Sequence, residues 1–325
     1  MPRDETGGHR PHIALVGASG FIGGATLRAL AASHGEVTAA VRRIPKSPIP
    51  GVRYVLSDIG VPSTLHSALD GVDAIVHAAS YTGPDETLCR RINYEGTRNL
   101  LAAAEARSID VVVTLSTIGV YGSGPFRDVV EDAREPNPVT VLSATRAAAD
   151  RMVRARGGIT VRPGFVHGEG DRWFLPGLRH ILTRIGAWID DGAALLSLIS
   201  VDELGELIAR LALTGSDADR GALFHAASPT PLSVFDIATR SATGGLPDTG
   251  CSFAEALARA AAVGLTDRHI DLVGRDHTID GTALWRRCDR SAARTLGVPD
   301  SPTRHHPQCQ PESMSPENVP VRGDH

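Results

Sequence analysis

The fold is decided by the stretch His12-Ile-Ala-Leu-Val16, which runs directly into Gly17-Ala-Ser-Gly20-Phe-Ile-Gly23. A short, mostly apolar run predicts a strand buried on both faces, and the glycines after it predict a tight turn that opens a helix. The first glycine permits the turn, the second lets the backbone approach a diphosphate, and the third lets helix and strand pack closely. The amides and dipole at the start of such a helix favour an anion. The stretch therefore predicts a dinucleotide-binding turn.

The rest of the chain repeats this alternation of buried strand and helix. Further apolar runs are EVTAAV, VRYVL, DAIVHA, DVVVTLS and GITVR, and helical patterns cover residues 21–32, 64–69, 85–107 and 138–156. Alternating strands and helices of this kind form a parallel sheet covered on both faces. We therefore predict an α/β protein with a Rossmann doubly wound parallel sheet and a smaller C-terminal substrate-binding lobe.

The predicted boundaries follow from where this regularity stops. We expect a flexible N-terminus at 1–11, a cofactor-binding core at 12–165, a mainly substrate-binding lobe at 166–299 and a disordered tail at 300–325. The lobe is expected to use the segments 173–188, 201–213 and 232–286. Within it, residues 244–286 are either a lid that orders over substrate or a surface helical insertion.

The end of the second expected strand indicates which dinucleotide is bound. NAD-binding proteins place an Asp or Glu about 20 residues after the glycine turn, where it binds the ribose 2′-hydroxyl. This chain has Arg42 and Arg43 there instead. Because a guanidinium binds phosphate in a bidentate manner, we expect NADP(H), with a solvated basic turn as the alternative.

Composition excludes several other functions. With 33 basic and 37 acidic residues, the net charge of -4 provides no field that attracts nucleic acid. No apolar run reaches about 18 residues and the N-terminus has no signal-peptide pattern, so we expect a cytoplasmic protein without a membrane partner. Cys89, Cys251, Cys288 and Cys309 lack the spacing of a zinc site or disulfide framework, so no metal is expected. The sequence leaves the oligomeric state open.

Motifs spread over most of residues 12–300 resemble the extended or atypical short-chain dehydrogenase/reductases, the group that includes nucleotide-sugar epimerases and dehydratases. Beyond the glycine turn, they are Asp58-Ile59, His77-Ala78-Ala79-Ser80, Asn93-Tyr-Glu-Gly-Thr-Arg-Asn, Ser116-Thr117-Ile-Gly-Val-Tyr121-Gly, Arg162-Pro163-Gly164-Phe-Val166-His167-Gly, Val201-Asp202-Glu203 and Asp289-Arg-Ser-Ala-Ala-Arg-Thr-Leu-Gly. The resemblance implies a nicotinamide cofactor bound by Gly17, Ser19, Gly20, Phe21, Ile22, Gly23, Asp58, Ile59, Ala78, Ala79, Ser80, Arg146, Pro163, Gly164 and Val166.

The active site of that family is only partly present. It resembles a Ser or Thr followed by a Tyr and, four residues later on one helical face, a Lys that lowers the tyrosine pKa. Here Thr117 takes the Ser/Thr position, whereas Leu142 and Arg146 stand at the Tyr and Lys positions. Leucine cannot transfer a proton, and arginine keeps its charge because its pKa is about 12 or above. Epimerase and dehydratase chemistry is therefore in doubt.

Hydride transfer to a carbonyl remains feasible, because it requires mainly positioning, but the product alkoxide needs a proton. Three sources are open. One is His167, which occupies a position where the family often has a tyrosine; another is water ordered by Thr117; the third is a phenolic hydroxyl beside the carbonyl of the substrate itself. Arg146 could hold the ribose and stabilise negative charge. Purely structural roles for Thr117 and His167 are the alternatives.

Loss of the Tyr/Lys pair on an intact cofactor scaffold resembles the atypical, angucyclinone-type ketoreductases of antibiotic pathways. The resemblance implies that NADPH reduces a ketone of a polycyclic aromatic polyketide to a secondary alcohol. Two alternatives stay open. The chain could be a non-catalytic NADP(H)-sensing regulator, or a nucleotide-sugar epimerase or dehydratase with displaced acid-base residues.

Overall fold

The computed structural model describes residues 10–33, 35–241 and 245–290. The predictions for residues 1–9 and for the tail at 300–325 lie outside these ranges, as does most of the motif that begins at Asp289.

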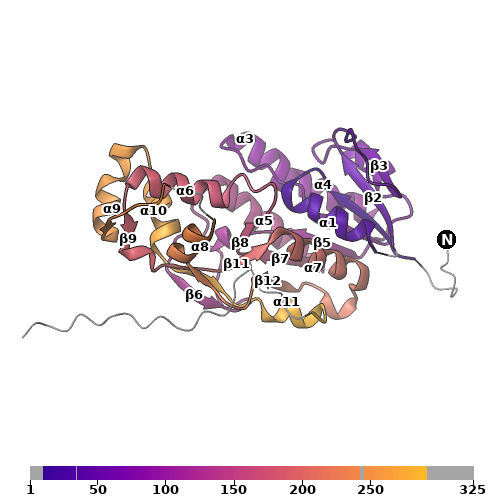
Figure 1. The fold of residues 1–325 in the computed structure, drawn as a ribbon. Coiled ribbons are helices and arrows are strands. Elements are labelled where there is room, and N and C mark those ends of the chain that lie inside the picture. The colour runs from indigo at the N-terminus through magenta and orange to yellow at the C-terminus, as the bar shows by residue number, and fades with distance from the viewer. Residues whose placement is uncertain (1–9, 34, 242–244, 291–325) are drawn as a thin grey trace, which may run out of the picture.

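A parallel sheet forms the centre of the larger part of the molecule (Figure 1). Its seven strands run in the order β12-β7-β5-β4-β1-β2-β3. Each predicted apolar run forms one of them: β1 (His12–Val16), β2 (Glu36–Val41), β3 (Val52–Leu56), β4 (Ala74–His77), β5 (Val111–Leu115) and β7 (Ile159–Pro163). The order reverses beside β1, so the carboxyl ends of β1 and β4 border the crevice in which such sheets bind ligands. The doubly wound prediction is therefore confirmed.

Helices cover both faces of this sheet because alternate strand residues point to opposite sides. On one face, Ile13 and Leu15 of β1 pack in a cluster with α1 (Phe21–Ala31), α7 (Val201–Thr214) and α11 (Thr282–Arg287). On the other, Ala14 and Val16 pack with α2 (Leu65–Ala68), α4 (Gly96–Glu105) and α5 (Val141–Ala155). The helix predicted at 85–107 is α3 (Glu86–Leu88), a π-helical segment η2 (Cys89–Glu95) and α4 in succession.

Two elements differ from the prediction. The seventh strand, β12 (Leu223–Ala226), was not predicted, because its short run contains His225. Residues 201–213 were expected in the smaller lobe, whereas α7 packs against α1 on the sheet. Gly205 allows this close crossing, since a Cβ there would lie 2.7 Å from the carbonyl carbon of Ala25.

The smaller lobe lies at the end of the molecule away from β2 and β3 (Figure 1). Its core contains α6 (Phe174–Ile185), α8 (Val234–Ser241), α9 (Phe253–Ala260) and α10 (Asp267–Gly274). A second sheet consists of β13 (Leu232–Ser233), β10 (Leu195–Leu196), β15 (His277–Ile279) and β6 (Phe126–Val129). Two further pairs of strands are β8 (Phe165–His167) with β11 (Leu198–Ser200), and β9 (Trp188–Ile189) with β14 (Gly250–Cys251). Short 3-10 helices are η1 (Pro62–Thr64), η3 (Ile118–Tyr121), η4 (Asp190–Gly192), η5 (Asp217–Asp219) and η6 (Ala261–Val263).

Residues 250–287, most of the expected lid or insertion, form β14, α9, η6, α10, β15 and α11. Ala256 and Ile270 are fully buried in the lobe core, so α9 and α10 are packed elements in this structure. Whether they move over substrate stays a prediction. Among the described residues, no helix is both long enough and apolar enough to cross a membrane.

Candidate cofactor and active site

The glycine turn between β1 and α1 has the close contacts that its sequence requires. Gly17 adopts φ +94°, and a Cβ there would lie 2.4 Å from the backbone nitrogen of Ala79. A Cβ on Gly23 would lie 2.1 Å from the carbonyl oxygen of Gly17. Gly20 is the N-cap of α1 and provides no capping side chain, so the amides of the first turn are available to an anion.

A cavity of about 250 Å³ opens directly in front of this turn, at the point where the strand order reverses. Predicted cofactor residues that line it include Ser19, Asp58, Ile59, Ala78, Ala79 and Ser80. Asp58 is fixed by its own turn, because one carboxylate oxygen accepts a hydrogen bond from the Gly60 amide at 2.8 Å. Tyr81 and Ile92 also line the cavity and were not predicted from the sequence.

A neighbouring cavity of about 820 Å³ is basic. Arg42, Arg43 and Lys46 line it together with Arg28, and its lining includes no Asp or Glu. Arg28 donates to the carboxylate of Asp202 at 2.8 Å, so its charge is partly paired. Arg42 and Arg43 are exposed and form no ion pair within the described residues. This arrangement suits a phosphate group at the end of β2.

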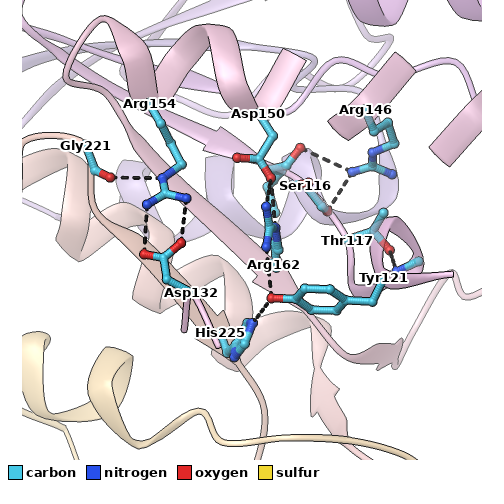
Figure 2. A network of polar contacts seen from close by, with 12 residues as sticks. Ser116, Thr117, Tyr121, Asp132, Arg146, Asp150, Arg154, Arg162, Gly221 and His225 are labelled. Atoms are coloured by element: carbon cyan, nitrogen blue, oxygen red, sulfur yellow. Dashed lines mark hydrogen bonds and ion pairs between the residues drawn. The ribbon is translucent and has the colours of Figure 1, made fainter. Parts of the chain in front are cut away.

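Thr117 and Arg146 lie at the carboxyl end of β5 (Figure 2). The Thr117 hydroxyl accepts a hydrogen bond from the Gly119 amide at 3.1 Å, which caps η3 and leaves the hydroxyl proton free to donate. Arg146 of α5 donates to the carbonyl oxygens of Leu115 at 3.2 Å and Ser116 at 2.7 Å. Burial lowers the pKa of Arg146 to about 10, with Asp150 acting in the opposite direction, so the side chain stays cationic at neutral pH.

His167 lies at the end of β8, opposite Ser200 of β11. It is buried, and Nε2 has no hydrogen-bond partner among the described residues. Burial lowers its pKa, whereas Asp171 raises it by a smaller amount. The imidazole is therefore neutral at pH 7 and a poor source of a proton. The loop after it passes the start of α1, since a Cβ on Gly170 would lie 3.6 Å from the Phe21 ring.

The predicted residues thus fall into two groups. Gly17, Ser19, Gly20, Arg42, Asp58, Ile59 and residues 78–80 line the first cavity, and Arg42 and Arg43 line the second. Phe21, Ile22 and Gly23, which belong to α1, line neither of the two. The remaining candidates also line neither cavity: Thr117 and Arg146 lie at the carboxyl end of β5, Pro163 and Gly164 at the end of β7, and Val166 and His167 in β8. At Gly164 the chain leaves the main sheet, and a Cβ there would lie 2.3 Å from the Ser197 carbonyl oxygen.

Beneath the second group is a buried polar network that the sequence prediction missed (Figure 2). The carboxylate of Asp150 pairs with Arg162 at 2.7 Å, and Arg162 also donates to the Tyr121 hydroxyl at 2.8 Å. Nε2 of His225 lies 2.6 Å from the same hydroxyl. The spacing of Asp150, one helical turn after Arg146, was a signal available in the sequence.

Comparison with known proteins gives relatives for most of the chain. The model of a family described as "NAD dependent epimerase/dehydratase family" matches residues 13–221. The chain is 33% identical over 205 residues to a 4-hydroxy-2-methyl-3-oxo-4-farnesyl-3,4-dihydroquinoline-1-oxide ketoreductase of Stigmatella aurantiaca, covering 59% of this chain and 61% of that protein. It is 28% identical over 246 residues to a 2-alkyl-3-oxoalkanoate reductase of Stenotrophomonas maltophilia, covering 69% of this chain and 73% of that protein.

The match is partial for several relatives. It spans 54% of the short-chain dehydrogenase/reductase family 42E member 1 of Bos taurus, at 28% identity and over 59% of this chain. Among solved structures, MoeE5 in complex with UDP-glucose and NAD has a TM-score of 0.68 at 22% identity, covering 88% of this chain and 94% of that chain. A short-chain dehydrogenase/reductase superfamily protein from Agrobacterium tumefaciens with bound NAD has a TM-score of 0.70 at 18% identity, covering 88% and 93%. At these identities the structures share the fold.

Proposed function

Because the chain belongs to the NAD dependent epimerase/dehydratase family, we propose that it is an NADPH-dependent ketoreductase of the atypical short-chain dehydrogenase/reductase type. It reduces a ketone of a polycyclic aromatic polyketide, of the angucyclinone kind, to a secondary alcohol in antibiotic biosynthesis. One observation carries the proposal: the chain keeps an intact glycine turn and a basic cavity, yet has Leu142 in place of the family's acid.

The residues present fit a nicotinamide dinucleotide. The Gly17 backbone approaches Ala79 so closely that any side chain would fill the turn, and α1 offers its first amides to a diphosphate. We assign the adenine end to Asp58 and Ile59, the 2′-phosphate to Arg42 and Arg43, and the nicotinamide end to Pro163, Gly164 and Val166. When bound and reduced, the nicotinamide supplies a hydride to the substrate carbonyl.

Two side chains then act on the carbonyl oxygen and the ribose. Thr117 accepts from the Gly119 amide, so its own proton is directed toward another acceptor, which we assign to the ketone oxygen. Arg146 uses Nη2 for the carbonyls of Leu115 and Ser116, which leaves other guanidinium hydrogens for the ribose and for negative charge that develops on oxygen.

The proton for the product alkoxide comes from the substrate in this proposal. Leu142 has none to give, and the lowered pKa of His167 disfavours the imidazolium at neutral pH. A phenolic hydroxyl beside the carbonyl provides an internal hydrogen bond and can neutralise the developing charge. This requirement supports an aromatic substrate, and the Stigmatella relative, named as the ketoreductase of an oxo-dihydroquinoline, provides a parallel.

The proposal is tested by following NADPH absorbance with 8-hydroxy-1-tetralone, 1-tetralone, a sugar nucleotide and no substrate. We expect oxidation of NADPH with the hydroxylated ketone, slower oxidation with 1-tetralone, and none with the other two. Tight NADPH binding without turnover of any ketone would favour the cofactor-sensing regulator. Epimerisation or dehydration of the sugar nucleotide, which consumes no net NADPH and is followed by chromatography of the products, would favour an epimerase or dehydratase. Either of these results would overturn the reductase.

A further inference from the structure

We propose that Tyr121, Asp150, Arg162 and His225 form a positioning device that holds the three segments of the active site in register. The inference rests on the proposed hydride transfer, because it concerns the placement of Thr117, Arg146 and the nicotinamide end of the cleft. All four side chains are at most 3% exposed, so we assign them as positioning residues and not as groups that contact substrate.

The network joins segments that are remote in sequence. Tyr121 comes from η3, Asp150 from α5, Arg162 from β7 and His225 from β12. Arg162 and His225 are directly aligned on neighbouring strands, and all four side chains are buried, with Tyr121 and His225 at 0% exposure. Figure 2 shows the Tyr121 ring reaching from the Thr117 turn toward the other three side chains.

Each of the three active-site segments contributes one member. Tyr121 ends the 3-10 turn that Thr117 caps, so the two residues are four apart on one rigid turn. Asp150 lies one turn after Arg146 on α5, and Arg162 directly precedes Pro163 and Gly164. If one segment moves, it therefore distorts the hydrogen bonds and the ion pair that connect it to the other two segments.

The hydrogen bonds of the network have a defined direction. Arg162 donates through Nε to Asp150 at 2.8 Å and through Nη1 to the Tyr121 hydroxyl at 2.8 Å, so the guanidinium fork is fixed at both ends. Burial and the nearby Arg162 lower the pKa of His225 to about 4, which keeps the imidazole neutral. The Tyr121 hydroxyl, which already accepts from Arg162, therefore donates to Nε2 of His225 at 2.6 Å.

Because the network is buried, its hydrogen bonds and ion pair form or break together. A buried guanidinium is tolerated only while its carboxylate and remaining acceptors stay in place, because an unpaired charge away from water is very costly. Small displacements are therefore resisted more strongly than apolar packing alone would resist them. Asp150 also acts on the part-buried Arg146, since its negative charge raises the pKa of that side chain.

The experiment compares Tyr121→Phe with a matched control in full-length protein. Tyr121→Phe removes a single oxygen and keeps the ring. The control is Asp219→Asn, which removes the charge of a buried carboxylate paired with the part-buried Arg287; Arg287 Nε lies 2.6 Å from Asp219 Oδ1. Asp219 ends η5, and the surface hollow that it lines also contains Asp110 and Gly157, which precede β5 and β7. The control therefore lies at the opposite, amino ends of the strands.

Two readouts distinguish positioning from stability. With 8-hydroxy-1-tetralone, Tyr121→Phe should lower kcat by about 10- to 100-fold at nearly constant KM, because a misplacement of about 1 Å at the reacting atoms costs about 100-fold. Asp219→Asn should lower the melting temperature at least as much and leave kcat within about twofold. His225→Gln, which keeps an acceptor for Tyr121, should retain more activity than His225→Leu.

The second readout needs no ketone. The emission of bound NADPH reports the surroundings of the nicotinamide, and it should change in Tyr121→Phe but not in Asp219→Asn, at similar cofactor affinity. Unchanged emission in Tyr121→Phe would overturn the inference even if ketones are reduced. A loss of kcat that merely follows the melting temperature in both variants would also overturn it. Wild-type protein that reduces no ketone would instead refute the proposed function.

Discussion

Replacing Arg42 and Arg43 by serine isolates the contribution of the 2′-phosphate to cofactor binding. Both arginines line a basic cavity without carboxylates at the end of β2, and both are exposed. A hydrogen bond to a charged group contributes about 1.5–3 kcal/mol to the binding free energy. Because both arginines are exposed, we assign each of them the lower value of this range. At about 1.4 kcal/mol per factor of ten, loss of both guanidiniums should weaken NADPH binding about 100-fold.

NADH lacks this phosphate, so its affinity should change by less than about threefold. Fluorescence titration of both cofactors at two salt concentrations measures the difference, and the NADPH advantage should shrink at high salt. Arg259→Ser is a matched control, because Arg259 is a half-exposed arginine on α9, in the smaller lobe. Equal wild-type affinities for NADPH and NADH, or equal losses for both in the double variant, would refute the assignment.

Three further predictions follow from the same geometry. Gly17→Ala places a side chain at φ +94° against backbone atoms, so NADPH binding should disappear in calorimetric titration; retained affinity would exclude this turn as the phosphate site. Burial lowers the pKa of both His77 and His225 to about 4. Between about pH 6.5 and 4 the unfolded chain therefore binds more protons than the folded protein does. As the pH falls through that range, each histidine lowers the free energy of unfolding by up to about 3 kcal/mol. Thermal unfolding should therefore show a smaller loss from pH 7 to pH 5 in His77→Gln than in wild type, and an equal loss would contradict the pKa shift. The double variant Leu142→Tyr with Arg146→Lys restores an acid on α5. It should accelerate the reduction of 1-tetralone at least about tenfold, since general acids contribute about 100-fold or more. A similar acceleration with 8-hydroxy-1-tetralone would argue against protonation by the substrate.

Most of the central sheet was predicted because its inner strands are largely apolar runs, whereas the edge strand β3 has no buried residue. HIALV and EVTAAV are buried on both faces, so their composition alone separates them from the helices that follow. β12 escaped because its run is only four residues long and includes His225, which is fully buried and hydrogen-bonded to Tyr121. The position of α7 depends on a crossing at Gly205, and a contact between two distant segments leaves no periodic signal.

The residues that line the two cavities were easier to predict from the sequence than the polar contacts at the end of β5. Glycine spacing and the arginines after β2 are local features, and the structure places both beside cavities. Arg146, in contrast, is held by backbone carbonyls at the end of β5, and Asp150 binds a partner on β7. Such roles depend on which strands are neighbours, which the order of residues along the chain does not specify.

In the proposed reaction, a reduced nicotinamide gives its hydride to a ketone, and no acid acts from position 142. The most direct measurement is a single turnover with 8-hydroxy-1-tetralone and NADPH deuterated at the transferring position, followed by mass and NMR analysis of the alcohol. We expect deuterium on the carbinol carbon of the product. Deuterium that stays in the cofactor, or an alcohol carbon labelled only from solvent, would contradict the proposed reaction.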